Sequence, residues 1–267
     1  MNLLSGKKTV SGAWLLNISN MSIRQMIRTG TEPRCLSAMK RANHLYSKIA
    51  EPDNIRMAFW KAAKGKHGNK EVIHFKVNFE ENIQKIQQQF ERNNLDIGYY
   101  HFFYVYDHKK RLICAASFPE RVIHHAIMNV CEPVLETYSI SDSYACRKEK
   151  GPRKAVLRVQ EYAREYAWFL KLDIRKYFDS VDHSILFQLL SRRFKEKPLL
   201  ELLKQLLDTY QLKKGKGLPI GNLVSQHRRM HFIHHNSCIC RIIDGHILKG
   251  GILFLFVTYR WQRILCH

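Results

Sequence analysis

The chain has 267 residues, 45% of them hydrophobic, which is enough to bury a core and excludes a disordered composition. Lys and Arg total 44 against 23 acidic residues, and the resulting charge of +21 favours polyanionic partners because each neutralised phosphate releases a counterion. Seven cysteines without a Cys-x-x-Cys pair are typical of a reducing, cytoplasmic compartment, and the longest apolar run, residues 252–257, is far shorter than the roughly 20 residues of a membrane span.

The first predicted elements are helices. The sequence changes character at Met39, so residues 1–38 are interpreted as an extension that precedes the folded unit. A helix is predicted from Asp53, a favourable N-cap, to Gly65, a favourable C-terminal stop. A second helix begins at Asn78, where apolar residues recur at helical spacing.

A β-hairpin and a further helix follow. Strands over 99–106 and 111–115 flank a predicted four-residue turn, which would contain Lys109 and Lys110. Ser117 and Glu120 form the pattern of a capping box, in which each residue bonds the other's backbone N–H. The helix that they open has a regular apolar side, and another helix is predicted after the Gly-Pro pair that follows.

A short strand and two helices are predicted in the second half. The strand, 168–173, ends at an acidic residue and alternates between its two faces. One helix is capped near Asp182 and the next begins near Pro198, since proline is accepted in a first turn. Glycines at 215, 217 and 221 are interpreted as a flexible connection.

Asp173, at the end of that strand, is the strongest chemical feature. Carboxylates at strand ends bind Mg²⁺, and two-metal polymerases use them to hold two ions about 3.5–4 Å apart. An Asp that only caps a turn fits this segment equally well. Asp179 and Asp182 are given structural roles, in the turn and at the N-cap. The second feature is Gly221, whose missing side chain lets backbone approach a base or sugar, although an ordinary loop-to-helix entry would look the same.

In their order and spacing, these segments resemble the motifs of reverse transcriptases, most closely those of diversity-generating retroelements. The resemblance runs from about Met39 to Gln226. Retroviral and group II intron enzymes usually have Gln-Gly followed by Ser-Pro in the fourth motif, where this chain has Ile-Gly followed by Ser-Gln, so a group II intron maturase is the less similar relative. The stretches that carry the resemblance are 53–56, 111–114 with 118–122, 143–147 with Gly151, 173–183 and 220–226.

The resemblance implies an α+β fold, a right-hand polymerase fragment without a thumb. Residues 39–165 would form helical and β-hairpin fingers, and residues 166–226 the first part of the palm. The implied activity is RNA-directed DNA synthesis by two-Mg²⁺ phosphoryl transfer. Its ligands would be Mg²⁺, deoxynucleoside triphosphates, an RNA template and a primer strand, with a small basic accessory protein as a further partner.

The resemblance also implies roles for single residues. Asp173 would bind both Mg²⁺ ions, with the Ile174 carbonyl as a further ligand. Phe178 would exclude a 2′-hydroxyl sterically, unless it is a buried core aromatic.

The nucleotide-binding roles fall on the hairpin and on the fourth motif. Arg111, with Lys109 or Lys110 as a second candidate, would bind the triphosphate, although a solvated basic turn describes the lysines equally well. Ile220 replaces a glutamine that touches the nucleotide in relatives, so selection of the incoming base should loosen. The fourth-motif residues of the nucleotide pocket would be Ile220, Gly221 and Gln226.

The family's Tyr-x-Asp-Asp motif is absent after Gln226, where Asp244 is the only acidic residue. Residues 227–267 hold six of the 14 histidines, and we interpret them as an out-of-frame, poorly ordered tail. A Zn²⁺ site among the histidines and cysteines of 231–240 is the less favoured alternative. One carboxylate cannot hold two Mg²⁺ ions normally, so weak polymerase activity is expected. A non-catalytic, basic RNA-binding protein is the alternative from another functional class.

Overall fold

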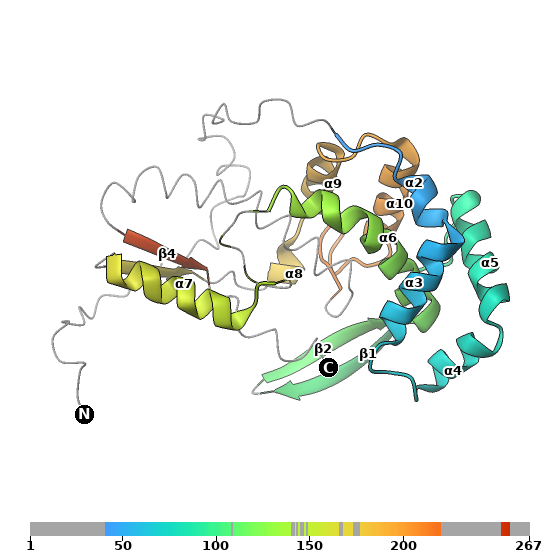
Figure 1. Ribbon diagram of the computed structural model, residues 1–267, viewed down its shortest axis with the longest axis horizontal. Coiled ribbons are helices and arrows are strands. Elements are labelled where there is room, and N and C mark those ends of the chain that lie inside the picture. Colours follow the sequence, from blue (N-terminus) through green and yellow to red (C-terminus); the bar gives the residue numbers. More distant parts are fainter. Residues whose placement is uncertain are drawn as a thin grey trace. The chain divides into compact units, whose positions relative to one another are not determined.

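A computed structural model of the chain has a mixed fold of helices and small sheets, which confirms the α+β class expected from the sequence (Figure 1). The predicted extension, residues 1–38, lies outside the described residues, and so does most of the predicted tail, 227–267. The structure describes residues 41–107, 109–139, 142, 144, 147, 149–165, 168–172, 177–219 and 252–256.

The N-terminal helices are α2 (Tyr46–Ala50), α3 (Pro52–Ala63), α4 (Lys70–Val77) and α5 (Phe79–Glu91). Helix α5 begins after Asn78, as predicted. Helix α3 begins one residue earlier than expected, because a proline fits the first turn, so the predicted cap Asp53 lies inside the helix.

Helix α4 was not predicted. Its N-cap is Asn69, whose side-chain oxygen accepts a hydrogen bond from the backbone N–H of Glu71 at 2.8 Å. Such a bond satisfies one of the N–H groups left without a partner at a helix start.

Helix α6 (Phe118–Glu136) forms the centre of the hydrophobic core, and it packs against α2, α3 and α4. Asn54 of α3 donates hydrogen bonds to the carbonyl oxygens of Ile49 and Ala126, both at 3.0 Å, which ties three helices together. The buried hydrophobic residues of α6 are Phe118, Val122, Ile123, Ala126, Ile127, Met128, Cys131 and Leu135.

Strands β1 (Tyr100–Asp107) and β2 (Lys109–Ala116) form an antiparallel hairpin whose register runs from Tyr100 opposite Ala116 to Asp107 opposite Lys109. A hairpin was predicted, but the turn at 107–110 was wrong. The pairing continues to its last possible position, so both lysines of the supposed turn belong to strand β2.

The second half of the chain contributes α7 (Pro152–Glu165) and β3 (Trp168–Leu172), as predicted. Strand β3 pairs in parallel with β4 (Ile252–Phe256), so five residues of the predicted tail are described as a strand. No helix in the described ranges is long and apolar enough to span a bilayer.

Helices α8 (Tyr177–Ser180), α9 (His183–Ser191) and α10 (Lys197–Asp208) complete the structure. Asp182 caps α9 as predicted, because its carboxylate accepts hydrogen bonds from the N–H groups of Ser184 and Ile185 at 3.0 and 3.3 Å. Helix α10 buries a stripe of five leucines, Leu199, Leu202, Leu203, Leu206 and Leu207.

Two glycines of the predicted flexible connection, Gly215 and Gly217, are held by hydrogen bonds at the start of α9, and the third, Gly221, lies outside the described residues. Gly217 donates its N–H to the carbonyl of Val181 at 2.9 Å, and His183 donates its N–H to the carbonyl of Gly215 at 2.9 Å. Gly217 has a φ of 110°, and a Cβ there would lie 2.9 Å from the backbone nitrogen of Leu212. Only glycine fits this close approach without strain.

Candidate nucleic-acid interface

Five of the predicted site residues lie outside the described part of the chain: Asp173, Ile174, Ile220, Gly221 and Gln226. Their metal-binding and nucleotide-binding roles remain predictions. Within the described ranges, no three His, Cys, Asp or Glu side chains are grouped closely enough to hold a metal ion. The predicted alternative, a Zn²⁺ site at 231–240, also falls outside these ranges.

Phe178, from the third motif, is 6% exposed and belongs to the hydrophobic core, as its structural interpretation expected. Its carbonyl oxygen accepts a hydrogen bond from the N–H of Leu218 at 2.9 Å. Leu218 lies two residues before the fourth motif, and the side chain of His183 lies 2.6 Å from the carbonyl oxygen of Gly217. The structure therefore places the residues that lead into the fourth motif beside the third motif, while the fourth motif itself, 220–226, lies outside the described residues.

The three basic residues predicted to bind a triphosphate do not all occupy the same face of the hairpin. Lys109, Lys110 and Arg111 are consecutive in β2, and successive positions of a strand belong to opposite faces of the sheet. Positions 109 and 111 therefore share one face, and Lys110 lies on the other. Lys110 is exposed, whereas the side chains of Lys109 and Arg111 are outside the description.

Lys110 stands beside a row of exposed aromatic side chains. Its Nζ lies 4.0 Å from the centre of the Tyr104 ring and 5.9 Å from that of Tyr106. The register places Tyr106 opposite Lys110, Tyr104 opposite Leu112 and Phe102 one pair further along the same face. The exposed fractions of Phe102, Tyr104 and Tyr106 are 55%, 55% and 73%. We call Phe102, Tyr104, Tyr106, Lys110 and Leu112 the aromatic face of the hairpin.

The sequence pattern of β1 indicates this aromatic face, although the family resemblance does not include it. Aromatic residues occur at alternate positions of β1, which places them on one side of a strand. In RNA-binding sheets, such aromatics stack on two or three bases. The family resemblance assigns roles only to the basic residues that follow them and none to the aromatic rings of this strand.

Glu120 attaches the root of the hairpin to α6, and its predicted capping-box role is wrong. Its buried carboxylate accepts hydrogen bonds from the backbone N–H groups of Gly98 and Tyr99, at 3.0 and 3.1 Å. Ser117 is the N-cap residue, but its side chain makes no capping hydrogen bond. The reason is a long-range contact. The residues just before β1 lie beside the first turn of α6, and their N–H groups bind the Glu120 carboxylate.

Burial also shifts the titration of groups around this root. Desolvation raises the pKa of Glu120, an effect that the Gly98 N–H partly offsets by stabilising the carboxylate. His124, one helical turn later, has its Nε2 3.5 Å from the Glu120 carboxylate. Burial raises the pKa of the Cys114 thiol to about 12, and the Tyr100 hydroxyl is hydrogen-bonded to Thr209 at 2.8 Å. The root of the hairpin is therefore held by buried side chains and by hydrogen bonds, whereas its outer part is exposed.

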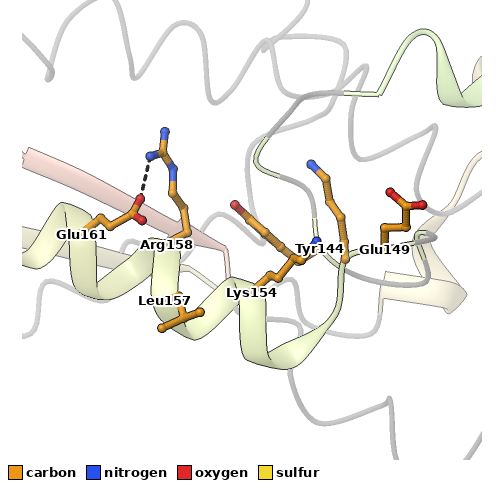
Figure 2. Close-up of a pocket in the computed structure, with 7 residues that line it drawn as sticks. Tyr144, Glu149, Lys154, Leu157, Arg158 and Glu161 are labelled. Atoms are coloured by element: carbon orange, nitrogen blue, oxygen red, sulfur yellow. Dashed lines mark hydrogen bonds and ion pairs between the residues drawn. The ribbon is translucent and has the colours of Figure 1, made fainter.

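A separate cavity of about 400 Å³ lies along α7 and the segment before it (Figure 2). Its lining combines basic and acidic side chains, and Arg158 is paired with Glu161 at 2.8 Å and with Asp142 at 3.2 Å. These acidic partners balance the guanidinium, so the cavity is a mixed-charge groove rather than an anion site. Its lining residues are Tyr144, Glu149, Lys150, Lys154, Leu157, Arg158 and Glu161.

Comparisons with known proteins identify distant relatives, and no protein-family model matches the chain. The chain is 26% identical over 113 residues to the COX1/OXI3 intron 2 protein of Saccharomyces cerevisiae, which covers 40% of this chain and 13% of that protein. It is 27% identical over 90 residues to the mitochondrial Nuclear intron maturase 1 of Arabidopsis thaliana, covering 34% and 13%. Protein YkfC of Escherichia coli is 23% identical over 128 residues, covering 44% and 34%.

These matches show a distant similarity to one broad group of proteins. The chain is similar, at low identity, to intron-encoded proteins and to an intron maturase, and it spans only about an eighth of the length of the first two. The names of these relatives refer to introns. They do not support the finer subtype of diversity-generating retroelements that the fourth motif indicates.

Proposed function

We propose that the chain is the fingers and the first part of the palm of an RNA-directed DNA polymerase from a retroelement. The observation that supports this proposal is the contact between the third motif and the residues that lead into the fourth motif. They are about 40 residues apart in the sequence, yet Leu218 donates its N–H to the carbonyl of Phe178 at 2.9 Å. Two motifs that build one nucleotide site must lie side by side. The intron-associated relatives and the charge of +21 support the same reading.

In this proposal, Asp173 holds Mg²⁺ at the end of strand β3. The described strand ends at Leu172, so the carboxylate follows directly after it. Mg²⁺ prefers oxygen ligands and is bound through carboxylates together with substrate phosphates. The Ile174 carbonyl would add a ligand, and a deoxynucleoside triphosphate would bring the phosphates. Arg111 and Lys109 share one face of the hairpin, so they are better placed than Lys110 to act together on a triphosphate.

Photochemical crosslinking of a labelled deoxynucleoside triphosphate to the purified 267-residue chain tests the nucleotide site. We expect labelling to require Mg²⁺ and to fall at least roughly tenfold in Asp173→Asn, as losses of metal-site residues do. Asp208→Asn is the matched control, because Asp208 is an exposed carboxylate at the end of α10. Labelling that is independent of Mg²⁺ and equal in both variants would refute the proposed site.

The proposal also concerns which class of reverse transcriptase the chain comes from. The Ile220-Gly221 and Ser225-Gln226 pairs favour a diversity-generating retroelement, whereas the relatives favour an intron-encoded enzyme. Binding to a structured group II intron RNA and to an unstructured RNA of equal length separates them. Tighter binding to the intron RNA would favour the intron lineage, and equal binding would favour the other.

A non-catalytic RNA-binding protein is the second candidate function. It is favoured by the exposed aromatic face of the hairpin, which needs no metal to bind RNA. Salt-dependent RNA affinity without Mg²⁺-dependent nucleotide labelling would support this second function over the first.

A further inference from the structure

The outer part of the hairpin exposes its aromatic face, although the inner part of the same face is covered. Cys114 and Ala116 continue this face toward the root, and both are buried. Tyr104 and Tyr106, further out, are more than half exposed. We propose that the aromatic face binds single-stranded RNA, with bases stacked on its rings and Lys110 beside the backbone phosphates.

The exposure itself indicates a ligand. A two-stranded hairpin is marginally stable in water unless its faces are packed against something. Contiguous exposed apolar patches are uncommon on soluble proteins and mark interaction sites. Here three aromatic rings and Leu112 form such a patch on the outer part of a hairpin that Glu120 anchors at its root.

The spacing of the rings suits nucleic-acid bases. Alternate residues of a strand are about 6.6–6.8 Å apart, so Phe102, Tyr104 and Tyr106 form an evenly spaced row. Every base has an aromatic face that can stack on such a ring. Base stacking on aromatic side chains requires no particular sequence, which suits a protein that must move along a template.

The charge of this face favours RNA over an apolar protein surface. The Lys110 ammonium lies 4.0 Å from the Tyr104 ring centre, so a cation stands among the rings. The described hairpin positions on this face, the even-numbered residues of 100–106 and 110–116, include no acidic residue. A phosphate backbone would be attracted to this cation, and the chain's net charge of +21 adds to the attraction. The choice of RNA over DNA rests on the proposed function, in which the template is RNA.

The experiment measures equilibrium binding of a labelled oligouridine to the full chain, without Mg²⁺ or nucleotide. We expect Tyr104→Ala and Tyr106→Ala each to weaken binding roughly 5- to 100-fold, and Tyr104→Trp to retain it. Phe103→Ala is the matched control, because Phe103 is similarly exposed but lies on the opposite face. Its affinity should stay within about twofold of the unmodified chain.

Salt dependence separates stacking from charge. The tyrosine variants should keep the slope of affinity against salt concentration, whereas Lys110→Ala should reduce that slope by about one. Far-ultraviolet circular dichroism checks that each variant is folded. Unchanged affinity in the tyrosine variants would overturn the proposal, and so would an equal loss in Phe103→Ala.

Two further outcomes bear on the ligand. Preferential binding of the matching DNA oligonucleotide would overturn the assignment to RNA. Variants that keep RNA affinity but lose binding to a protein partner would assign the face to that protein instead. Since this assay uses neither metal nor nucleotide, it can succeed even when Asp173→Asn shows no effect on nucleotide labelling, and the two proposals can therefore fail separately.

Discussion

Helices α6 and α7 are both amphipathic and both have a proline in their first turn, yet they have very different environments. Val122 and Ile127 of α6 are fully buried, whereas Val156 and Leu157 of α7 are 47% and 49% exposed. No residue of α7 in the described range up to Arg164 is buried. An apolar stripe thus predicts that a helix needs a cover, but it does not predict that the described chain provides one.

The difference is one of packing: α6 lies within the hydrophobic core, whereas α7 has exposed side chains. Helix α6 is enclosed by neighbouring helices and holds the hairpin root through Glu120. Helix α7 is supported by exposed ion pairs, such as that of Arg158 with Glu161, and exposed pairs contribute little to stability. The aromatic face therefore extends from a packed base, whereas the residues of α7 up to Arg164 include no buried side chain.

The largest expected effect is in the core around α6. Phe118→Ala removes a buried ring that contacts the rings of Phe59 and Phe75, at centre distances of 5.7 and 5.4 Å. The loss of burial and the cavity left behind should lower the free energy of unfolding by about 3–5 kcal/mol. Urea denaturation followed by circular dichroism measures this change. A loss below about 1 kcal/mol would show that α6 is not the centre of the stable core.

The next effect concerns the link between α6 and the hairpin. Glu120→Ala removes the buried carboxylate that accepts hydrogen bonds from the N–H groups of Gly98 and Tyr99, which should lower the free energy of unfolding by about 1–3 kcal/mol. Hydrogen exchange of β1 amides should rise at the same time. If exchange in β1 stays unchanged, Glu120 does not anchor the hairpin.

A smaller effect is expected in the pH dependence of stability. Burial raises the pKa of Glu120 above its unfolded value, so the folded chain binds this proton more tightly. The contribution to stability is then complete below the unfolded pKa and is lost as pH rises through the folded pKa. Glu120→Gln keeps an acceptor oxygen but cannot titrate. Its stability relative to the unmodified chain should therefore increase from about pH 4.5 to pH 7, as urea titrations would measure.

The smallest effect is expected in α7. Leu157→Ala should change the free energy of unfolding by less than about 0.5 kcal/mol, because half of the side chain is already in water. The same urea assay used for Phe118→Ala gives the comparison directly. A loss above about 2 kcal/mol would mean that α7 is covered in solution, and the contrast with α6 would disappear.

Local signals predicted much of the secondary structure. The spacing of Phe79, Ile83, Ile86 and Phe90 identified α5, and Asp182 identified the start of α9, because periodicity and capping act within a few residues. The hairpin was recognised, but its turn was placed wrongly. The pattern of side chains does not say how far pairing continues, and the register resolved this by pairing Asp107 with Lys109.

Some features of the candidate site were likewise predictable from local sequence, and others depended on the fold. The order of the motifs and the excess of positive charge could be read directly, and they indicated a nucleic-acid enzyme. The separation of Lys110 from positions 109 and 111 needed only the correct strand assignment. The burial of Phe178 and its contact with Leu218 needed the fold, since these two residues are 40 positions apart in the sequence.

By itself, the sequence determined the α+β class, the positions of most helices and a net charge of +21, which favours polyanionic partners. These properties depend on composition and on contacts within one or two helical turns. Only the tertiary structure decided that Glu120 is a buried anchor instead of a cap, that Gly217 is fixed in place, and that the rings of β1 remain exposed. Each of these outcomes depends on whether a distant segment covers the residue, and such long-range contacts are not encoded in any short stretch of the chain.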